Sequence, residues 1–308
     1  WPVIDMRSRK RHLDGVLLLD KPSGPSSNAA LQQVKQLYRA HKAGHTGSLD
    51  PLASGLLPIC FGEATKLSSY LLTGDKGYRA IARLGQRTDT LDAEGQLLAE
   101  APIDAIDERK IEAALVAFRG DISQIPPMYS ALKRGGEALY ALARQGLEVE
   151  REPRRVHIAR LDLVDFCPPF MVLDVDCSSG TYIRTLIDDL GQVLGCGAHV
   201  HALRRTWAAP FRQPEMIEMA ALEALNGQFT ALDACLLPLE SMVAALPRAT
   251  IAGHDLLRFA HGNPVPHEGA PVAAAIAVHD PQGCLLGIAR CADGETLKAV
   301  RVLNRQSS

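Results

Sequence analysis

The sequence lacks the short motifs that mark several large enzyme classes. It has no GxGxxG, GxxxxGKS/T, HExxH or GxSxG segment, which argues against a nucleotide cofactor, a zinc hydrolase and a serine hydrolase. No apolar run among its 308 residues approaches the roughly 20 residues that cross a bilayer. The first residues, Trp1 to Asp5, also lack the basic-then-apolar pattern of a secretory signal. We therefore expect a cytoplasmic protein without a membrane partner, and a mechanism based on a single carboxylate remains open.

Cysteine is scarce and has no recognisable spacing. The seven cysteines are an odd number and form no CxxC pair, which argues against a disulfide framework and a zinc knuckle. Cys196, His199 and His201 lie close together, but no second cluster with metal spacing accompanies them. We expect these three residues to be structural and the protein to bind no metal.

Charge is nearly balanced overall but is unevenly distributed. The formal net charge is −2, which does not by itself indicate a nucleic-acid-binding protein. Residues 1–160 hold 23 Lys and Arg against 19 Asp and Glu, whereas residues 161–308 hold 10 against 16. Basic side chains cluster at 7–11, 151–160 and 204–205, and these clusters weakly favour RNA or DNA as a partner.

Hydrophobic periodicity predicts an α+β protein. Strands are expected at 15–20, 78–84, 156–166 and 171–177, and helices after Ser26 and at 108–118 and 181–194. From composition we divide the chain into a basic tail (1–12), a large domain (13–246) and a small, mostly β domain (247–308). A proline- and glycine-containing basic segment at about 124–152 is expected to be an insertion and a candidate lid over RNA.

One acidic residue, Asp50, stands in a glycine-rich run that is otherwise almost free of charge. The run is Gly44-His45-Thr46-Gly47-Ser48-Leu49-Asp50-Pro51-Leu52-Ala53-Ser54-Gly55. Asp followed by Pro is a common helix start, in which the carboxylate caps the first turn. A lone carboxylate beside a histidine can instead be a reactive group. The segment alone leaves both interpretations open, and capping is the simpler one.

Five segments, in this order, resemble the TruB family of tRNA pseudouridine synthases. They span about two-thirds of the chain: Gly15-Val16-Leu17-Leu18-Leu19-Asp20-Lys21-Pro22, Ala43-Gly44-His45-Thr46-Gly47-Ser48-Leu49-Asp50-Pro51, Lys76-Gly77-Tyr78-Arg79, Gly85-Gln86-Arg87-Thr88-Asp89-Thr90-Leu91-Asp92 and Ser179-Gly180-Thr181-Tyr182-Ile183-Arg184. The resemblance implies an enzyme that isomerises uridine to pseudouridine in the T-loop of tRNA, at position 55. It also implies a pseudouridine synthase fold, with a mixed, mainly antiparallel sheet flanked by helices, and a PUA-like RNA-binding domain at 247–308.

The resemblance further implies a role for individual residues. Asp50 matches the family's catalytic aspartate, the nucleophile that lets the uracil detach from its ribose. The other matched residues contact RNA or this carboxylate: His45 wedges into the RNA stack, Tyr78 stacks on the target uracil, Tyr182 forms a second wall, Arg184 pairs with the aspartate and Leu203 contacts the base. Lys21, Asp92 and Arg204 lie near pattern positions and are expected to support the site from behind.

The chemistry of the reaction agrees with these assignments. Pseudouridine formation breaks the C1′–N1 bond, turns the uracil and makes a C1′–C5 bond, so no redox or group-transfer cofactor is needed. An aspartate with a reference pKa of about 4 is ionised at neutral pH, and a nearby Arg keeps it so. The target base must be flipped out of a folded loop, which costs on the order of a few kcal/mol. Whether the carboxylate attacks C1′, attacks the base or helps to form a glycal is left open.

Individual side chains and the whole chain have alternative interpretations. Tyr78 at the start of a strand could be a core aromatic, and a phenol pKa near about 10 makes it a poor general base, so stacking is its expected role. The protein could also be an RNA-folding chaperone that opens the tRNA elbow without catalysis, or a domain in which Asp50 only caps a helix. No heptad seam or apolar interface run is evident, so a monomer is expected.

Overall fold

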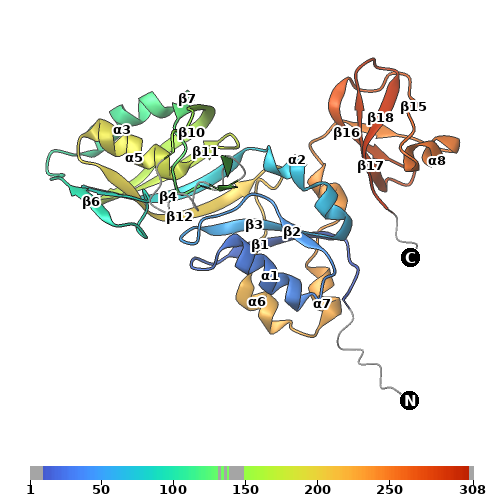
Figure 1. Ribbon diagram of the computed structural model, residues 1–308, viewed down its shortest axis with the longest axis horizontal. Coiled ribbons are helices and arrows are strands. Elements are labelled where there is room, and N and C mark those ends of the chain that lie inside the picture. The colour runs from blue at the N-terminus through green and yellow to red at the C-terminus, as the bar shows by residue number, and fades with distance from the viewer. Residues whose placement is uncertain (1–9, 131–132, 135–136, 139–148, 305–308) are drawn as a thin grey trace.

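The computed structural model describes residues 10–130, 133–134, 137–138 and 149–304. Two β-sheets dominate it, a long one that carries most of the helices and a small one near the C-terminus (Figure 1). Most of the expected basic tail (1–12) and much of the expected insertion (124–152) lie outside the described residues. Among the described residues, no helix is both long enough and apolar enough to cross a membrane.

The long sheet is mixed and mainly antiparallel, as the family resemblance implies. Its described strands run in the order β13-β1-β3-β12-β4-β11-β10-β7, with β2 paired to β3. Among these described strands, only the β1–β13 and β3–β12 pairs are parallel. The strand bounds are Ile217–Glu218 (β13), Gly15–Lys21 (β1), Ser54–Phe61 (β3), Ala198–Ala208 (β12), Lys76–Leu84 (β4), Phe170–Cys177 (β11), Arg154–Cys167 (β10), Gly120–Gln124 (β7) and Ala43–His45 (β2).

Strand β1 is apolar from Val16 to Leu19 because both faces of the sheet are covered there. Side chains alternate along a strand, so Leu17 and Leu19 enter one core cluster while Val16 and Leu18 enter another. The first cluster lies under the helices. The second is shared with the C-terminal sheet, which contributes residues such as Ile288. The sheet is therefore held between two apolar layers, and its strand ends are left free to carry loops.

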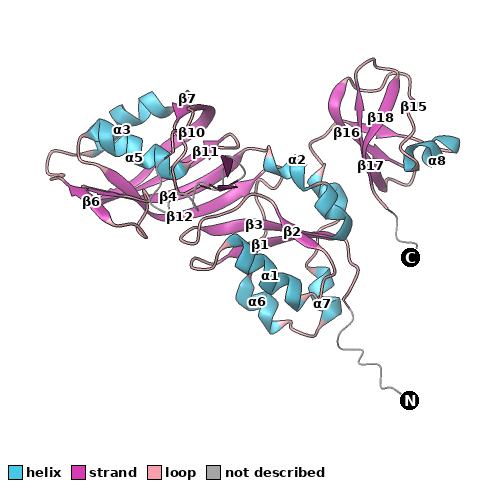
Figure 2. Cartoon of the chain, in the orientation of Figure 1, coloured by secondary structure: helices cyan, strands magenta, loops and turns pink. Residues whose placement is uncertain are grey.

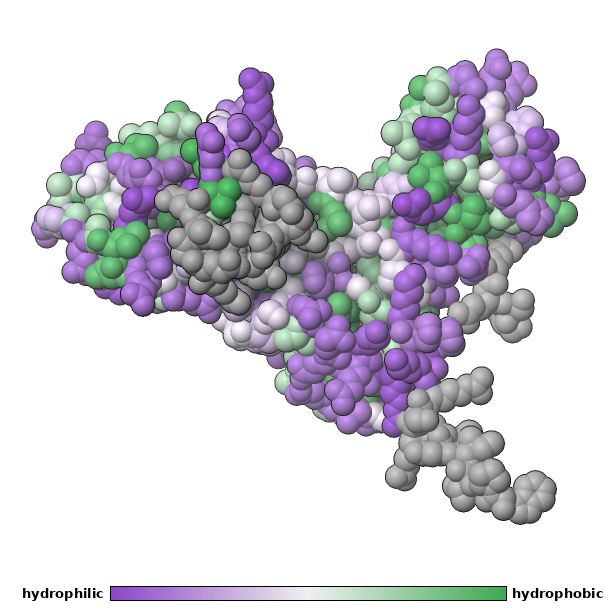
Figure 3. Space-filling view, in the orientation of Figure 1, coloured by the Kyte–Doolittle hydropathy of each residue, from purple (hydrophilic) through white to green (hydrophobic). Residues whose placement is uncertain are grey.

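The helices form two groups along the long sheet (Figures 1 and 2). The helices near β1 are α1 (Ser27–Leu37), α6 (Met219–Ala224) and α7 (Phe229–Ala234). The helices near β4 and β12 are α3 (Glu108–Leu115) and α5 (Ile183–Leu194). The short helix α2 spans Ser68–Leu72. Ser26 caps α1 by accepting a hydrogen bond from the Ala29 N–H (3.1 Å). Helix α1 buries Ala30, Leu31 and Val34, and hydrophilic side chains cover the outside of this lobe (Figure 3).

Short elements complete the part of the chain that carries the long sheet. Among the described residues, three 3₁₀ segments occur, η1 (Gly62–Lys66), η2 (Val116–Phe118) and η3 (Leu239–Met242), and two small hairpins are β5 (Gln86–Thr88) with β6 (Leu97–Glu100) and β8 (Lys133–Arg134) with β9 (Glu137–Ala138). The expected helix at 108–118 is thus α-helical to Leu115 and 3₁₀ thereafter. The expected helix at 181–194 begins two residues later, at Ile183, because Tyr182 has an extended backbone.

The C-terminal sheet has the order β14-β16-β17-β18-β15. Its elements are Arg248–Thr250 (β14), His254–Ala260 (α8), Val265–Pro266 (β15), Ala273–His279 (β16), Leu285–Cys291 (β17) and Thr296–Val302 (β18). It has its own core around Phe259, Ile276 and Leu297. Its last strand also reaches the large lobe, where the Lys66 Nζ donates to the Val302 carbonyl (3.2 Å).

Candidate active site

Asp50 lies in the loop between β2 and β3, at an open end of the long sheet. The alternative in which Asp50 only caps a helix is contradicted, because residues 46–53 form bends and irregular loop and no helix follows Pro51. The loop is tied down by its backbone. Ser27 of α1 accepts a hydrogen bond from the Leu49 N–H (2.7 Å) and donates to the Leu49 carbonyl (3.0 Å). The residue before Asp50 is therefore fixed, while the Asp50 side chain is 41% exposed.

Arg184 holds the Asp50 carboxylate. The Arg184 Nε lies 2.9 Å from the Asp50 Oδ2, and the Arg184 side chain is only 7% exposed. Its other nitrogens are also engaged: one Nη donates to the Thr90 carbonyl (3.1 Å) and the other to the Tyr129 carbonyl (2.7 Å). A guanidinium with all its nitrogens in use has little freedom to turn. It fixes one carboxylate oxygen and leaves the other available.

Asp92 supports Arg184 from the side away from Asp50. Its Oδ2 lies 3.6 Å from an Arg184 Nη, and the residue is buried. Its Oδ1 accepts hydrogen bonds from the Thr90 hydroxyl (2.6 Å) and the Glu94 N–H (3.1 Å). Asp92 thus compensates the buried guanidinium charge, and it does not line the smaller hollow in front of Asp50.

Lys21 supports the loop from beneath. It ends β1 with no exposed surface, and its Nζ donates to the carbonyls of Pro22 (2.8 Å), Pro25 (2.7 Å) and Pro51 (3.4 Å). Burial lowers the pKa of Lys21 to about 8, against the opposing effect of the nearby Asp50 charge. Lys21 therefore ties the Lys21–Pro25 turn to the residue that follows Asp50.

A hollow of about 180 Å³ opens in front of Asp50. Tyr78 of β4, Leu203 of β12 and Tyr182 at the start of α5 line it together with Asp50 and Arg184. Burial raises the pKa of the Tyr78 and Tyr182 phenols. Both tyrosines consequently stay neutral. At neutral pH even less of Tyr78 than of a free phenol is in the phenolate form that could accept a proton. Their flat, uncharged rings beside a carboxylate suit a planar, neutral ligand.

A second, larger hollow of about 420 Å³ adjoins the first and shares Asp50 and Arg184 with it. His45, at the end of β2, lines this second hollow with Asp92 and Glu94. Burial, with the nearby Arg205 charge, lowers the pKa of His45 below its ordinary value. His45 is therefore a neutral imidazole that lines the same hollow as Asp50, and its Nδ1 makes no hydrogen bond to any described residue.

The pKa of Asp50 reflects a competition between burial and charge. Burial raises it above its ordinary value, and the Asp92 carboxylate adds to the rise. Arg184, by charge and hydrogen bond, and Lys21 oppose that rise. The sequence-based expectation that Arg keeps the carboxylate ionised describes one side of this competition only.

Arg204 is not brought to the hollow, whereas its neighbour Arg205 supports it. Arg204 pairs with Asp20 through two contacts of 2.9 and 2.6 Å and lines a separate hollow. Arg205 is buried, donates to the carbonyls of Leu56 (2.7 Å) and Gly47 (2.9 Å), and so holds both ends of the Asp50 loop. In the sequence, Arg205 stands out only as part of a basic cluster. Side chains alternate along a strand, so Arg205 lies on the same face of β12 as Leu203, and this spacing is the signal that could identify it.

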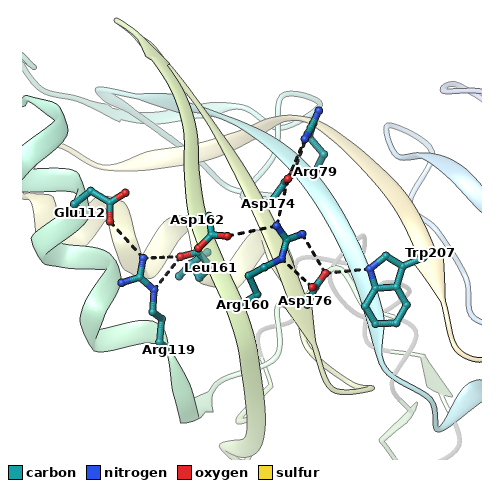
Figure 4. Close-up of polar contacts among 9 residues, drawn as sticks. All are labelled: Arg79, Glu112, Arg119, Arg160, Leu161, Asp162, Asp174, Asp176 and Trp207. Atoms are coloured by element: carbon teal, nitrogen blue, oxygen red, sulfur yellow. Dashed lines mark hydrogen bonds and ion pairs between the residues drawn. The ribbon is translucent and has the colours of Figure 1, made fainter. Parts of the chain in front are cut away.

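Another basic side chain from an expected RNA-binding cluster is committed to ion pairs. Arg160 of β10 contacts Asp176 (2.9 Å), Asp162 (3.4 Å) and Asp174 (3.6 Å), as Figure 4 shows. Asp176 also accepts a hydrogen bond from the Trp207 indole (3.0 Å). The Asp carboxylates on this face of the sheet therefore compensate the positive charge of Arg160. The cluster at 151–160 therefore offers RNA less positive charge than its sequence suggests.

None of the described residues form a group of three or more His, Cys, Asp or Glu arranged to hold a metal ion. The Cys196–His201 segment makes ordinary structural contacts. The His199 Nδ1 lies 3.2 Å from the Gln86 carbonyl oxygen, and the His201 ring packs on the Phe170 ring at 4.8 Å between centroids.

Comparison with known proteins identifies the family of this chain. Residues 35–183 match the family description "TruB family pseudouridylate synthase (N terminal domain)", and residues 184–244 match "tRNA pseudouridylate synthase B C-terminal domain". The chain is 51% identical over 296 residues to "tRNA pseudouridine synthase B" of Pseudomonas aeruginosa (strain UCBPP-PA14), covering 96% of this chain and 97% of that one. It is 50% identical over 299 residues to the protein of the same name from Coxiella burnetii (strain RSA 331 / Henzerling II), covering 96% and 95%.

A solved structure with a similar fold was also found. A chain in "Crystal Structure of a Cbf5-Nop10-Gar1 Complex" superimposes with a TM-score of 0.72 at 26% identity, covering 94% of this chain and 84% of that chain. The fold, with Asp50 and Arg184 meeting at its open sheet end, is that of a pseudouridine synthase, an isomerase. The chain belongs to the TruB family of pseudouridylate synthases.

Proposed function

We propose that this protein converts uridine to pseudouridine in the T-loop of tRNA, at position 55, and that Asp50 carries the chemistry. The observation that supports this most directly is the Asp50 carboxylate, held at 2.9 Å by Arg184 and open to a hollow with two tyrosines. Substrate choice follows the relatives at about half identity, which are named for tRNA.

In this proposal the target nucleoside is flipped out of the loop into the hollow in front of Asp50. Tyr78 stacks on the uracil, and Tyr182 and Leu203 bound it on other sides. His45, neutral and in the same hollow as Asp50, is suited to fill the space that the base vacates. Replacing base–base stacking by stacking on side chains offsets part of the cost of flipping.

The Asp50 carboxylate then assists departure of the uracil from C1′. The C1′–N1 bond breaks, the uracil turns within the hollow, and a C1′–C5 bond forms. The proton leaves C5, and N1 gains one, so the product has the same atoms as the substrate. Arg184 fixes one oxygen of Asp50 throughout, which leaves the Oδ1 directed at the substrate.

Recognition of the rest of the tRNA is proposed to depend on loop shape and phosphates more than on base edges. The small β domain at 247–308 is proposed to be PUA-like and to contact RNA. The insertion at 124–152 is also proposed to contact RNA. We further propose that the enzyme acts in the cytoplasm, as a monomer.

The direct test is to incubate the protein with an unmodified tRNA transcript and to map pseudouridine at single-nucleotide resolution. We expect one modified position, in the T-loop, and none in a matched transcript with cytidine at that position. Pseudouridine at another site, or none at all, would contradict the proposed substrate.

A further inference from the structure

Helix α5 carries Tyr182 and Arg184 into the site but lacks an ordinary cap. Tyr182 occupies the N-cap position, and its side chain makes no capping hydrogen bond. The first turn also contains no acidic residue. The end of a helix leaves several N–H groups without partners, so another group is needed to fix where this helix begins.

Gln124 supplies that group. It is the last residue of β7, and only 2% of it is exposed. Its Oε1 accepts a hydrogen bond from the Tyr182 N–H (3.0 Å), and its Nε2 donates to the Tyr182 carbonyl (3.3 Å). One amide side chain thus pairs with both backbone groups of one residue, as a neighbouring strand would.

The backbone of Tyr182 has the conformation that this pairing requires. Its φ of −102° and ψ of 107° are extended, whereas Ile183 begins the helix. The same Tyr182 carbonyl accepts the first helical hydrogen bond, from the Leu186 N–H (3.0 Å). Gln124 therefore sits at the point where the chain turns from extended to helical, and it explains why α5 starts two residues later than the sequence predicts.

Two further hydrogen bonds join the segment after β7 to the first turn of α5. Together with the two Gln124–Tyr182 bonds they form a row that we call the seam. The Thr185 hydroxyl donates to the Ile125 carbonyl (3.4 Å), and the Arg184 Nη2 donates to the Tyr129 carbonyl (2.7 Å). Among the residues that the structure describes, Gln124 is the only one whose side chain pairs with both backbone groups of Tyr182. A shift of the helix start would move the Arg184 guanidinium away from Asp50.

We propose that Gln124 is a positioning residue for pseudouridine formation: by pairing with the Tyr182 backbone it sets the start of α5 and so the contact between Arg184 and Asp50. This proposal rests on the proposed role of Asp50. Gln124 touches neither the hollow in front of Asp50 nor the carboxylate itself. Its effect must pass through Tyr182 and Arg184.

The test compares Gln124→Met, which keeps the side-chain length but loses both hydrogen bonds, with the wild type. Misplacing a reacting geometry by about 1 Å can cost on the order of 100-fold in rate, so we expect kcat to fall about 10- to 100-fold with KM changed less than about threefold. Thr185→Val is the matched control, since it removes a neighbouring seam bond from a buried side chain but leaves the Tyr182 backbone paired. Its kcat should stay near that of the wild type.

A pH profile separates positioning from loss of stability. Among the described residues, the charged and titratable groups around Asp50 are Arg184, Asp92, Lys21, Glu94, Tyr78, Tyr182 and His45. Of these, Arg184 opposes protonation most strongly, so a loosened Arg184 should move the acid limb of kcat to higher pH. Thermal unfolding of each variant reports stability alone.

The same shift should be visible without turnover, as a higher titration midpoint of the Asp50 carboxyl ¹³C resonance in Gln124→Met. A folded Gln124→Met with wild-type kcat, or with an unmoved acid limb and carboxyl titration, would overturn the proposal. If that variant does not fold, Gln124→Asn, which can reach one Tyr182 group only, should show smaller shifts in the same directions, and their absence would overturn it equally. A wild type that forms no pseudouridine in tRNA, with the carboxyl shift still present, would instead count against the proposed function.

Discussion

The Nε of Arg184 lies 2.9 Å from the Oδ2 of Asp50, although the Asp50 loop leads into β3 and the Arg184 helix α5 follows β11, two strands that β12 and β4 separate in the sheet. The Arg184 side of this contact is nearly closed, because Arg184 is 7% exposed, donates to two carbonyls and lies near Asp92, whereas Asp50 is 41% exposed. An ion pair of this kind orients a carboxylate more than it adds stability. The following predictions test what that orientation does.

Replacing Arg184 by Lys should lower kcat by about 100-fold or more, because an ammonium keeps the charge but cannot reach Asp50 and both carbonyls at once. Arg87→Lys is a matched control. Arg87 also makes a two-point contact with a carboxylate, Asp188 (2.7 and 3.0 Å), on the same helix but outside the hollow. Single-turnover rates on a tRNA transcript measure both. Equal rates for the two variants would show that the Arg184 geometry does not matter.

Replacing Lys21 by Met should destabilise the fold by about 1–3 kcal/mol, since the carbonyls of Pro22, Pro25 and Pro51 lose the Lys21 donor. The effect should also depend on pH. The folded pKa is about 8 and the reference value 10.5, so between these values the unfolded chain binds more protons and wild-type stability gains with rising pH. Urea unfolding should therefore show the gap between wild type and Lys21→Met widening from about pH 8 to about 10.5. A constant or narrowing gap would contradict the assigned burial of Lys21.

Tyr78 should act through its ring. In an Asp50→Asn background, Tyr78→Phe should bind tRNA about as tightly as the parent, whereas Tyr78→Leu should lose about 1–3 kcal/mol, the value of one base–aromatic stack. Equilibrium filter binding measures both affinities at one fixed salt concentration. Similar losses in the two variants would point to the hydroxyl, which lies near Arg205.

Gly55 should be essential for the close approach of β3 and β12. A Cβ at Gly55 would lie 2.2 Å from the Arg205 carbonyl oxygen, at a φ of +97°. Gly180 has a similar φ of +85° but open space around its Cβ position. Gly180→Ala should therefore cost only about 1–2 kcal/mol of backbone strain, while Gly55→Ala should cost more than about 3 kcal/mol. Thermal unfolding that ranked the two variants the other way would refute the steric argument.

Local signals in the sequence predicted much of the fold. Ser26 caps α1, and Gly195, at a φ of +78°, ends α5, because capping depends on residues a few positions apart. The Asp-Pro pair was misleading for the same reason. Its local preference for a helix start is overridden by Lys21, Ser27 and Arg184, which bind the loop from distant parts of the chain.

The residues of the candidate site also fall into two groups, those that the sequence identified and those that only the structure revealed. Asp50, Tyr78, Tyr182, Arg184 and Leu203 share one hollow, and the family resemblance had named them together. Gln124 and Arg205 escaped the sequence analysis because their partners, the backbones of Tyr182 and Gly47, lie 58 and 158 positions away. Such contacts come from strand order, which the sequence pattern does not specify.

Asp50→Asn tests the central claim most directly, since it preserves shape while removing the negative charge. The variant should bind an unmodified tRNA transcript within about threefold of wild type, because most affinity comes from phosphate contacts elsewhere. It should form no pseudouridine in the T-loop under conditions in which the wild type modifies every molecule. Turnover by Asp50→Asn at a rate near that of the wild type would contradict the account, and complementation of an enzyme-deficient cell by that variant would favour an RNA-chaperone function instead.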